Sequence, residues 1–220
     1  WAKFCKISIF LLTVRNYILS SATHVDLARS DGYYNLLKRA MDEGKLDVSA
    51  IATTNYNIFI QKIIGKDVTY LNGSTELWYD PYLNRIAKKS DLDDPEHHLL
   101  VPLMFTQSGT KPMTSIGMSI WYVDTFRKWE QSDAVVVVGF GFGRDDEHIN
   151  GIIRTLIDED GKRVIVVKPD ERKAEEEEVS LIADKLKVSR TENIRVILVD
   201  TSGTQIGTQI KWTESILNIK

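Results

Sequence analysis

The sequence predicts an α/β protein with a Rossmann-like parallel sheet, helices on both faces of that sheet and a small irregular inserted segment. Three apolar runs, at residues 134–138, 163–167 and 194–199, are separated by two stretches with helical periodicity. Strands that alternate with helices in this way form parallel sheets whose connections pass over the two faces. The run at 134–138 is apolar at every position, which is typical of a strand covered on both faces, so we expect it to be the central strand.

The other elements follow from the spacing of apolar residues. Apolar side chains recur every three or four residues in the segments expected to be helical, which are residues 4–19, 33–40, 58–64, 118–129, 149–157, 179–186 and 212–219. Short runs with β-branched residues predict strands at 48–54 and 68–71. The apolar stretch at 7–14 is too short to cross a bilayer, so we expect it to be a buried part of the first helix.

Two segments depart from these patterns. Residues 78–112 lose their periodicity and contain several prolines and charged side chains, which favours an irregular segment that covers the binding site. The run Glu175–Glu178 lies where a helix begins, and negative charge is favourable there. We therefore expect this run to be a solvated first turn without a catalytic role.

Composition narrows the class of protein. Hydrophobic residues make up 43% and charged residues 27%, as in a globular chain, and 220 residues suit one domain that spans 1–220. A formal net charge of −3 argues against nucleic acid as a partner, because nucleic-acid surfaces carry a basic excess. We expect neither a nucleic-acid nor a membrane partner, and a homo-oligomer or an additional domain stays open.

Cysteine content and the first residue add two expectations. Cys5 is the single cysteine, so the chain has no intrachain disulfide and no zinc site built from cysteines. This composition fits a cytoplasmic protein. The sequence begins with Trp1 rather than Met, so we expect its natural start to lie upstream.

Three turns carry the candidate chemistry, because open α/β sheets bind ligands beyond the carboxyl ends of their strands. The first is Thr53-Thr54-Asn55-Tyr56-Asn57, the second is Asn72-Gly73-Ser74, and the third is the glycine-rich segment at 139–143. Glycines between a strand and a helix let backbone N–H groups approach a pyrophosphate. The spacing of this segment is not G-x-G-x-x-G, so alone it fits a plain tight turn equally well.

In this order the three turns resemble the sirtuin-like superfamily, in particular its bacterial branch without a zinc ribbon. Residues 53–57 resemble the family's T-T-N-Y-D, residues 71–74 resemble L-H-G-S, and residues 138–150 resemble V-G-Y-S-F-G-D-E-H-I-N. The resemblance implies NAD⁺ as substrate or ligand, bound where the three turns meet at one edge of the sheet. It also implies NAD⁺ hydrolysis in bacterial defence against phage.

Carried over residue by residue, the resemblance implies catalytic positions at Asn55 and Asn72. Asn55 would lie beside the nicotinamide ribose and place the attacking water. The implied cofactor-binding residues are Thr53, Thr54, Asn57, Gly73, Ser74, Gly139 and Gly141.

This sequence also departs from the family pattern. Asn72 stands where the family has its catalytic histidine, and an amide does not act as a general base. Asn57 stands where the family has an aspartate, so the charge of that position is lost. The family's early G-A-G-x-S loop is absent from residues 1–220.

Two functions stay open. In the first, the chain is an NAD⁺ glycohydrolase that releases nicotinamide and forms ADP-ribose. In the second, it is a catalytically silent module that binds NAD⁺ or ADP-ribose, or a scaffold. A general base contributes roughly 10²–10⁴-fold to a rate, so Asn72 favours a slow or silent protein.

No metal is expected. His97, His98 and the nearby Asp93 or Asp94 match no known ligand spacing. We interpret His97 and His98 as residues of a surface loop, and His148 as a structural residue at the start of a helix.

Overall fold

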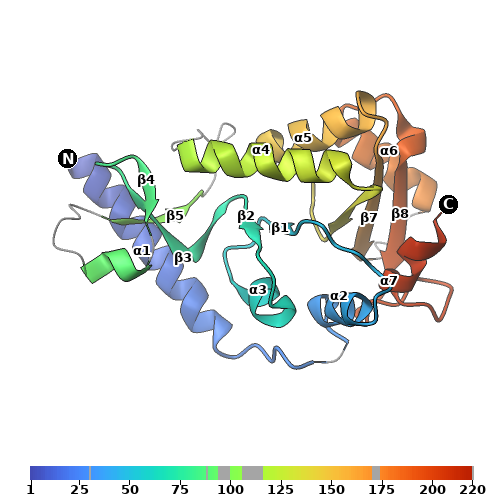
Figure 1. The fold of residues 1–220 in the computed structure, drawn as a ribbon, viewed down its shortest axis with the longest axis horizontal. Coiled ribbons are helices and arrows are strands. Elements are labelled where there is room, and N and C mark those ends of the chain that lie inside the picture. Colours follow the sequence, from blue (N-terminus) through green and yellow to red (C-terminus); the bar gives the residue numbers. More distant parts are fainter. Residues whose placement is uncertain (30, 88, 94–99, 106–115, 170–173, 220) are drawn as a thin grey trace. The chain divides into compact units, whose positions relative to one another are not determined.

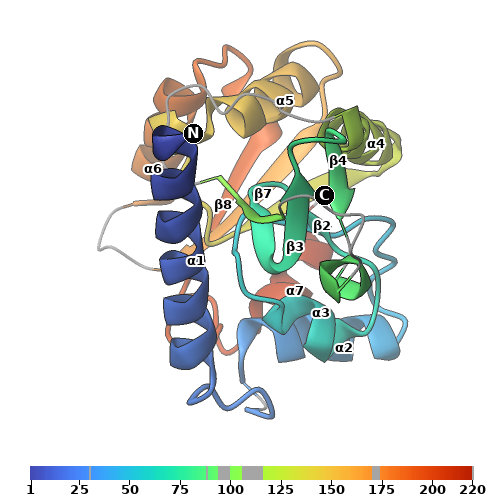
Figure 2. The same cartoon turned by 90° about the vertical axis from the view of Figure 1, so that its left-hand side faces the viewer.

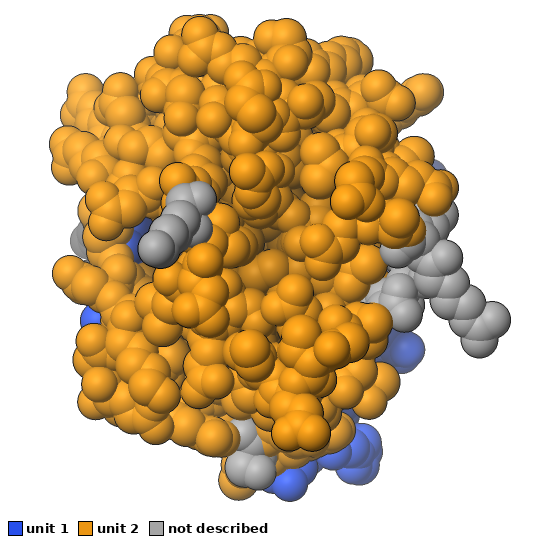
Figure 3. Space-filling model, turned by 90° about the vertical axis from the view of Figure 1, so that its right-hand side faces the viewer, with its two compact units in different colours: residues 1–27, 50–108, 112–125 blue, residues 28–49, 109–111, 126–220 orange. Residues whose placement is uncertain are grey.

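The computed structural model describes residues 1–29, 31–87, 89–93, 100–105, 116–169 and 174–219 (Figure 1). The chain divides into two compact units, which have different colours in Figure 3. Unit 1 comprises residues 1–27, 50–108 and 112–125, and unit 2 comprises residues 28–49, 109–111 and 126–220. The single domain predicted for residues 1–220 thus contains two compact units. Helix α4 (Ile116–Gln131) begins in unit 1 and ends in unit 2.

Unit 2 is built on a parallel sheet. Strands β6 (Ala134–Val138), β7 (Arg163–Pro169) and β8 (Ile194–Val199) pair in the order β6-β7-β8. Helix α5 (Glu147–Asp158) connects β6 to β7, and α6 (Glu175–Leu186) lies between β7 and β8 in the chain (Figure 1). The alternation of strands and helices predicted from the sequence is confirmed.

Helices cover both faces of this sheet. Alternate residues of β7 and β8 form a core with α2 (Tyr33–Asp42), α7 (Trp212–Ser215) and the short helix η4 (Ile216–Asn218), comprising Leu36, Ile165, Val167, Ile197, Val199, Trp212 and Ile216. The intervening residues of the two strands point to the opposite face, and α5 packs against β7 and α6 against β8. The Rossmann-like class predicted from the sequence is therefore confirmed for unit 2.

The predicted central strand is wrong. In the described sheet β6 and β8 are the edge strands, and β7 is the central one. The side chains on one side of β6 remain accessible, since Val136 and Val138 are each 38% exposed. An apolar run does not distinguish a strand buried on both faces from an edge strand. The described strands also follow one another in sequence order, so no reversal of strand order lies within this sheet.

Unit 1 contains two small sheets. Strands β1 (Ala52–Thr53) and β2 (Thr69–Tyr70) are parallel, with α3 (Phe59–Ile64) between them in the chain. Strands β3 (Gly73–Asp80), β4 (Arg85–Ala87) and β5 (Val101–Met104) form an antiparallel sheet in the order β4-β3-β5. The short helix η1 (Lys89–Asp93) follows β4.

The prediction that residues 78–112 are irregular is wrong for the part that the structure describes. Most of the antiparallel sheet lies in this segment. The backbone N–H groups of Tyr82 and Leu83 donate to Oδ1 of the buried Asp80, and Asn84 has a positive φ of 50°. These contacts form the tight turn between β3 and β4. Of the prolines that suggested irregular structure, Pro81 lies in this turn and Pro102 lies inside β5, while Pro95 and Pro112 lie outside the described residues.

Helix α1 (Ala2–Ala22) is present as predicted, but its apolar stretch is not buried. Ile9 and Phe10 are more than half exposed, and no residue of α1 is fully buried. The helix lies beside β3 and β5 within unit 1 (Figure 2). Arg15 holds it there, because its Nε donates to the backbone oxygen of Thr75 at 2.7 Å and its guanidinium lies 4.9 Å from the ring centroid of Trp78.

None of the helices that the structure describes combines the length and the apolar character needed to cross a membrane.

Candidate functional site

A cavity of about 260 Å³ lies in unit 2 at the carboxyl ends of β6 and β7. The cavity is lined by the glycine-rich segment at 139–142, by residues near the end of β7 and by residues of α6. This is the place where parallel α/β sheets bind ligands. The volume is somewhat below the roughly 300–1,000 Å³ of pockets for whole small molecules, so the cavity suits a part of a larger ligand.

The glycine-rich segment has the backbone shape that this wall requires. Gly139 has a φ of 67°, and its N–H donates to the backbone oxygen of Val167 at 3.0 Å. A Cβ added at Gly141 would meet no atom within 4 Å, so the backbone there borders open space. Phe142 is buried and packs edge-on against Phe140, with 5.1 Å between the ring centroids. Gly139 and Gly141, which were predicted as cofactor-binding residues, both line the cavity.

The helix that follows the segment fixes its far end. The side-chain Nδ2 of Asn150, which is buried in α5, donates to the backbone oxygen of Gly143 at 3.0 Å. The same Nδ2 lies 3.4 Å from Oε2 of Glu147. Asn150, the last residue of the D-E-H-I-N motif, thus ties the glycine-rich segment to α5 through a structural hydrogen bond.

Two lysines supply positive charge to the cavity. Lys168, near the end of β7, donates through Nζ to Oε2 of Glu178 at 2.8 Å, and Lys185 donates through Nζ to the backbone oxygen of Gly141 at 3.0 Å. All three charged side chains line the cavity. An anionic group in the cavity would therefore meet ammonium groups from β7 and α6.

The prediction that Glu175–Glu178 is solvated is wrong for Glu178. Glu175, Glu176 and Glu177 are exposed, but the side chain of Glu178 is only 3% exposed and forms an ion pair with Lys168. A carboxylate buried in this way needs a charged partner. The four glutamates are alike in the sequence. In the helix only Glu178 points to the inner face, because successive residues point in different directions around the helix axis.

The start of α5 is acidic. Asp145 and Asp146 precede the helix, and Glu147 is its first residue. The Arg154 side chain donates a hydrogen bond to Glu147 at 2.7 Å and lowers the pKa of that carboxyl below its ordinary value. These carboxylates already occupy the favourable position at the helix N-terminus. The lysines, rather than this helix end, are the positive groups of the cavity.

In unit 1 the first two predicted turns lie next to each other. Because β1 and β2 are parallel, Thr53–Asn55 and Leu71–Asn72 extend from the same edge. The N–H of Leu71 donates to the backbone oxygen of Thr53 at 2.9 Å, and the N–H of Thr75 donates to that of Tyr56 at 2.8 Å. The Tyr122 hydroxyl of α4 donates to the backbone oxygen of Leu71.

Exposure separates the predicted residues of the first turn. Thr53 is buried, and its Oγ1 accepts a hydrogen bond from the N–H of Asn55 at 3.1 Å. Thr54 is half-buried and Asn55 is exposed. Asn57 has a structural contact, since its Oδ1 accepts a hydrogen bond from the N–H of Phe59 at 3.2 Å where α3 begins. Asn55 is therefore the most accessible of these residues.

The second turn is shorter than predicted. Gly73 and Ser74 begin strand β3, so the turn consists of Leu71 and Asn72. Asn72 is buried, and Ser74 is 0% exposed, with its Oγ accepting a hydrogen bond from the N–H of Glu76. Gly73 has a φ of 78°, and a Cβ there would lie 1.9 Å from the backbone oxygen of Leu103. The packing of β5 against β3 thus explains why position 73 is glycine.

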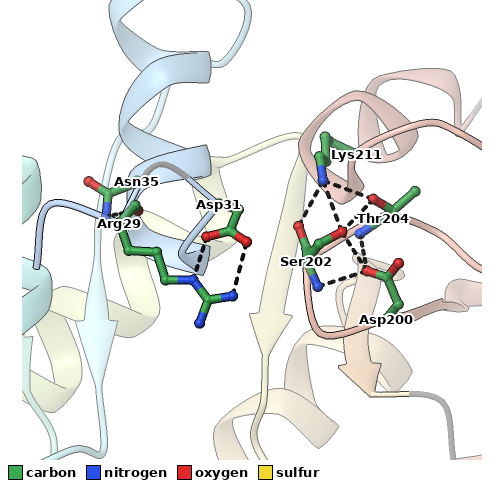
Figure 4. A network of polar contacts seen from close by, with 7 residues as sticks. All are labelled: Arg29, Asp31, Asn35, Asp200, Ser202, Thr204 and Lys211. Carbon is green, nitrogen blue, oxygen red and sulfur yellow. Dashed lines mark hydrogen bonds and ion pairs between the residues drawn. The ribbon is translucent and has the colours of Figure 1, made fainter. Parts of the chain in front are cut away.

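The carboxyl end of β8 carries a polar network (Figure 4). Asp200 Oδ1 accepts hydrogen bonds from the N–H groups of Ser202 and Thr204 and from the Ser202 hydroxyl. Lys211 Nζ donates to Ser202 and Thr204 at 2.8 to 3.1 Å. The hydrogen bond from the Thr204 N–H is the main cause that lowers the pKa of Asp200, followed by the Ser202 hydroxyl. These groups bind one another, so the network stabilises the loop after β8.

The charged residues of the cavity went unpredicted. Lys168, Glu178 and Lys185 were not predicted as site residues, although all three line it. The available signal was the position of Lys168 at the end of the strand that follows the glycine-rich segment, where Rossmann folds contact a ribose. Asp94, His97 and His98 lie outside the described residues. Among the residues that are described, no group of three His, Cys, Asp or Glu side chains could hold a metal ion.

Fold and site define a Rossmann-like α/β protein with a partly cationic cavity beyond the carboxyl ends of two parallel strands. No family model matches the chain, and no curated protein matches it. Solved structures do resemble it. A crystal structure of Sir2 in complex with the inhibitor EX-527, 2′-O-acetyl-ADP-ribose and a deacetylated p53 peptide matches 65% of this chain and 59% of its own, with 18% identity and a TM-score of 0.43.

Two further structures are similar to the same degree. A complex of Sir2 with a p53 peptide and NAD⁺ has 16% identity and a TM-score of 0.41, over 61% of this chain and 56% of that one. A sirtuin studied for the structural basis of substrate affinity has 16% identity and a TM-score of 0.44, over 71% of both chains. This chain therefore spans less than two thirds of the length of the two Sir2 chains.

Proposed function

We propose that this chain is a sirtuin-like domain that binds NAD⁺ and cleaves its glycosidic bond to nicotinamide. The observation that carries the proposal is the cavity in unit 2, where the glycine-rich segment and the ammonium groups of Lys168 and Lys185 border one space. Glycine backbone admits a pyrophosphate closely, and lysines complement its charge. The aromatic and aliphatic walls at Phe140 and Leu181 suit the base of a nucleotide.

The chemical step falls to the residues of unit 1. Cleavage of the glycosidic bond passes through a cationic, oxocarbenium-like sugar, so it depends on positioning and on stabilisation of positive charge. Asn55 is exposed and carries an amide oxygen that orients a water molecule by accepting a hydrogen bond. Asn72 follows β2, the strand paired with β1. It is buried, and its amide does not act as a general base. We accordingly propose slow hydrolysis, in which the glycosidic C–N bond breaks, nicotinamide leaves with the bonding electron pair, and water bonds to the sugar carbon and releases its proton to solvent.

The experiment is incubation of the purified chain with NAD⁺ and chromatographic measurement of nicotinamide and ADP-ribose. Slow release that falls at least tenfold in Asn55→Ala supports the proposal. Asn72→His introduces an imidazole at a buried position, so circular dichroism must first show that this variant is folded. A folded Asn72→His variant is expected to release nicotinamide faster, because a general base adds roughly 10²–10⁴-fold.

The second candidate is a catalytically silent module, and Asn72 is the observation that favours it. In this case NAD⁺ or ADP-ribose binds in calorimetry, but neither the wild-type chain nor Asn72→His releases nicotinamide. If neither NAD⁺ nor ADP-ribose binds, both candidates are contradicted. The role in bacterial phage defence is part of the first candidate, and loss of cellular NAD⁺ during infection of a bacterium that expresses the chain would test it.

A further inference from the structure

Lys168 and Glu178 form an asymmetric ion pair in the wall of the cavity. Their side chains are 19% and 3% exposed, so the ammonium is the more accessible partner and the carboxylate lies behind it. Only one carboxylate oxygen, Oε2, accepts the ammonium, at 2.8 Å. The second oxygen, Oε1, is buried and accepts no hydrogen bond within the part of the chain that the structure describes. Glu178 therefore orients Lys168, while a ligand in the cavity meets the ammonium first.

The position of Lys168 in the fold indicates which part of a dinucleotide it faces. The glycine-rich segment follows β6, and Lys168 lies near the end of β7, the next strand of the same parallel sheet. In Rossmann folds the residue at this place contacts the ribose of the adenosine half. An acidic residue there accepts hydrogen bonds from the ribose hydroxyls, whereas a basic residue accommodates a 2′-phosphate.

The other charges of the cavity support an anion at this place. Lys185, from α6, lines the same cavity and is held by the backbone oxygen of Gly141. The carboxylates at the start of α5 do not line it, and Glu178 is the acidic side chain among the described lining residues. That carboxylate is nearly enclosed, so among the described lining residues the more accessible charges are the ammonium groups of Lys168 and Lys185.

We propose that Lys168 is a specificity-determining residue that binds a phosphate on the 2′ position of the adenosine ribose, so that the domain binds NADP⁺ more tightly than NAD⁺. This inference rests on the proposed function, because it places the adenosine half of the dinucleotide in this cavity. The interaction is a charge-assisted hydrogen bond from Nζ to a phosphate oxygen. It is expected to strengthen binding about tenfold, which is roughly 1.4 kcal/mol.

Calorimetry on the full chain with NAD⁺ and NADP⁺ at low salt tests the proposal. We expect Kd for NADP⁺ to be about tenfold lower than Kd for NAD⁺. Adenosine 2′,5′-bisphosphate should bind more tightly than 5′-AMP by the same factor. This comparison assigns the effect to the 2′-phosphate, because both ligands carry the 5′-phosphate. In Lys168→Met the Kd values for NADP⁺ and NAD⁺ should become equal, because the ammonium that distinguishes the 2′-phosphate is lost.

The variants must separate recognition from stability. Lys168→Met leaves the Glu178 carboxylate buried without its partner, so the double variant Lys168→Met with Glu178→Gln, which removes both charges, provides a second test. Lys187→Met is the matched control, because Lys187 follows α6 and its side chain is 74% exposed. The control should keep the full preference for NADP⁺, and both cavity variants should lose it.

The outcomes distinguish this inference from the proposed function. Equal affinities, or tighter binding of NAD⁺, overturn the role of Lys168 and leave NAD⁺ binding intact. A preference for NADP⁺ that survives in both cavity variants also overturns it. If neither dinucleotide binds, the proposed function and this inference fail together.

Discussion

At the scale of single residues, Gly73 shows how a motif position can be fixed by packing. Its φ of 78° lies in the left-handed region, and a Cβ would approach the backbone oxygen of Leu103 to 1.9 Å. We expect Gly73→Ala to lower the free energy of unfolding by about 3 kcal/mol, from backbone strain and from the displacement of β5. Urea unfolding followed by circular dichroism measures this change.

Gly65 provides the control for that experiment. It ends α3 with a φ of 71°, but a Cβ there would meet no atom within 4 Å. Gly65→Ala should therefore cost about 1 kcal/mol, from the backbone conformation alone. Equal losses in the two variants would show that the close approach of Leu103 is unimportant.

Asp200 gives the loop after β8 a dependence on pH. Hydrogen bonds from Thr204 and Ser202 lower its pKa in the folded state below the ordinary value of 3.8. A lowered pKa stabilises the folded chain above pH 3.8, and this stabilisation is lost as the pH falls through the folded-state pKa. We expect Asp200→Asn to have a lower Tm at pH 7 and pH 5, and the difference from wild type to shrink below pH 3.8.

Thermal unfolding of both proteins at pH 7, 5 and 3 tests this dependence. Ser202→Ala is the matched variant, because it removes one hydroxyl donor and keeps the carboxylate. It should show a smaller loss of Tm at pH 7 than Asp200→Asn. A difference between Asp200→Asn and wild type that is constant from pH 7 to pH 3 would refute the role of the carboxylate.

At the scale of elements, apolar periodicity predicted most helices and parallel strands, because each of them buries one regular stripe or run. The strands at 163–167 and 194–199 became β7 and β8, and the helix predicted at 118–129 is α4. The antiparallel sheet was missed because β4 is only three residues long and β5 contains Pro102. Neither strand shows a two-residue alternation that a sequence pattern could detect.

The same limit applies to the site. The glycine-rich segment was predicted from local sequence and does line the cavity. The Lys168–Glu178 pair joins two elements ten residues apart, and its formation depends on how α6 packs against the sheet. The run of four glutamates gave no sign that only its last member is buried. Tertiary packing, rather than local composition, selects the charged residues of the cavity.

Asn150 connects two elements, since it ties the glycine-rich segment to α5. We expect Asn150→Ala to lower the free energy of unfolding by about 2 kcal/mol, because a buried hydrogen bond to the Gly143 oxygen is lost. Hydrogen exchange should also accelerate in residues 139–143. The control is Asn193→Ala, whose amide reaches the backbone oxygen of Ile157 at a longer 3.4 Å. Unchanged exchange in residues 139–143 of Asn150→Ala would contradict the tie.

At the scale of the whole molecule, the predicted site residues are divided between the two units. Thr53 to Asn57 and Asn72 to Ser74 belong to unit 1, and Gly139 and Gly141 belong to unit 2. We predict that the residues of unit 2 recognise an adenosine nucleotide and that the residues of unit 1 bind a nicotinamide nucleotide. Fragments of the ligand therefore separate the contributions of the two units.

Two variants address the halves with little effect on folding. Gly141→Val places a side chain into the space beside the glycine-rich segment, where a Cβ meets no atom within 4 Å. Asn55→Ala removes an exposed amide. We expect Gly141→Val to weaken 5′-AMP binding at least tenfold and to leave nicotinamide mononucleotide unaffected, because the added methyl groups occupy the nucleotide's place. Asn55→Ala should weaken binding of nicotinamide mononucleotide and leave binding of 5′-AMP unaffected. Either change should weaken binding of NAD⁺.

Calorimetry with the three ligands, together with Tm values to show that both variants are folded, provides the measurement. NAD⁺ at 100 times its Kd should stabilise the wild-type chain by about 2.7 kcal/mol and each variant by less, because a tenfold weaker Kd removes about 1.4 kcal/mol of that stabilisation. Binding of NAD⁺ that responds only to Gly141→Val would assign the whole ligand to unit 2. In that case Asn55 would have no part in the chemistry, and the residues of unit 1 would be explained by their contacts within the fold.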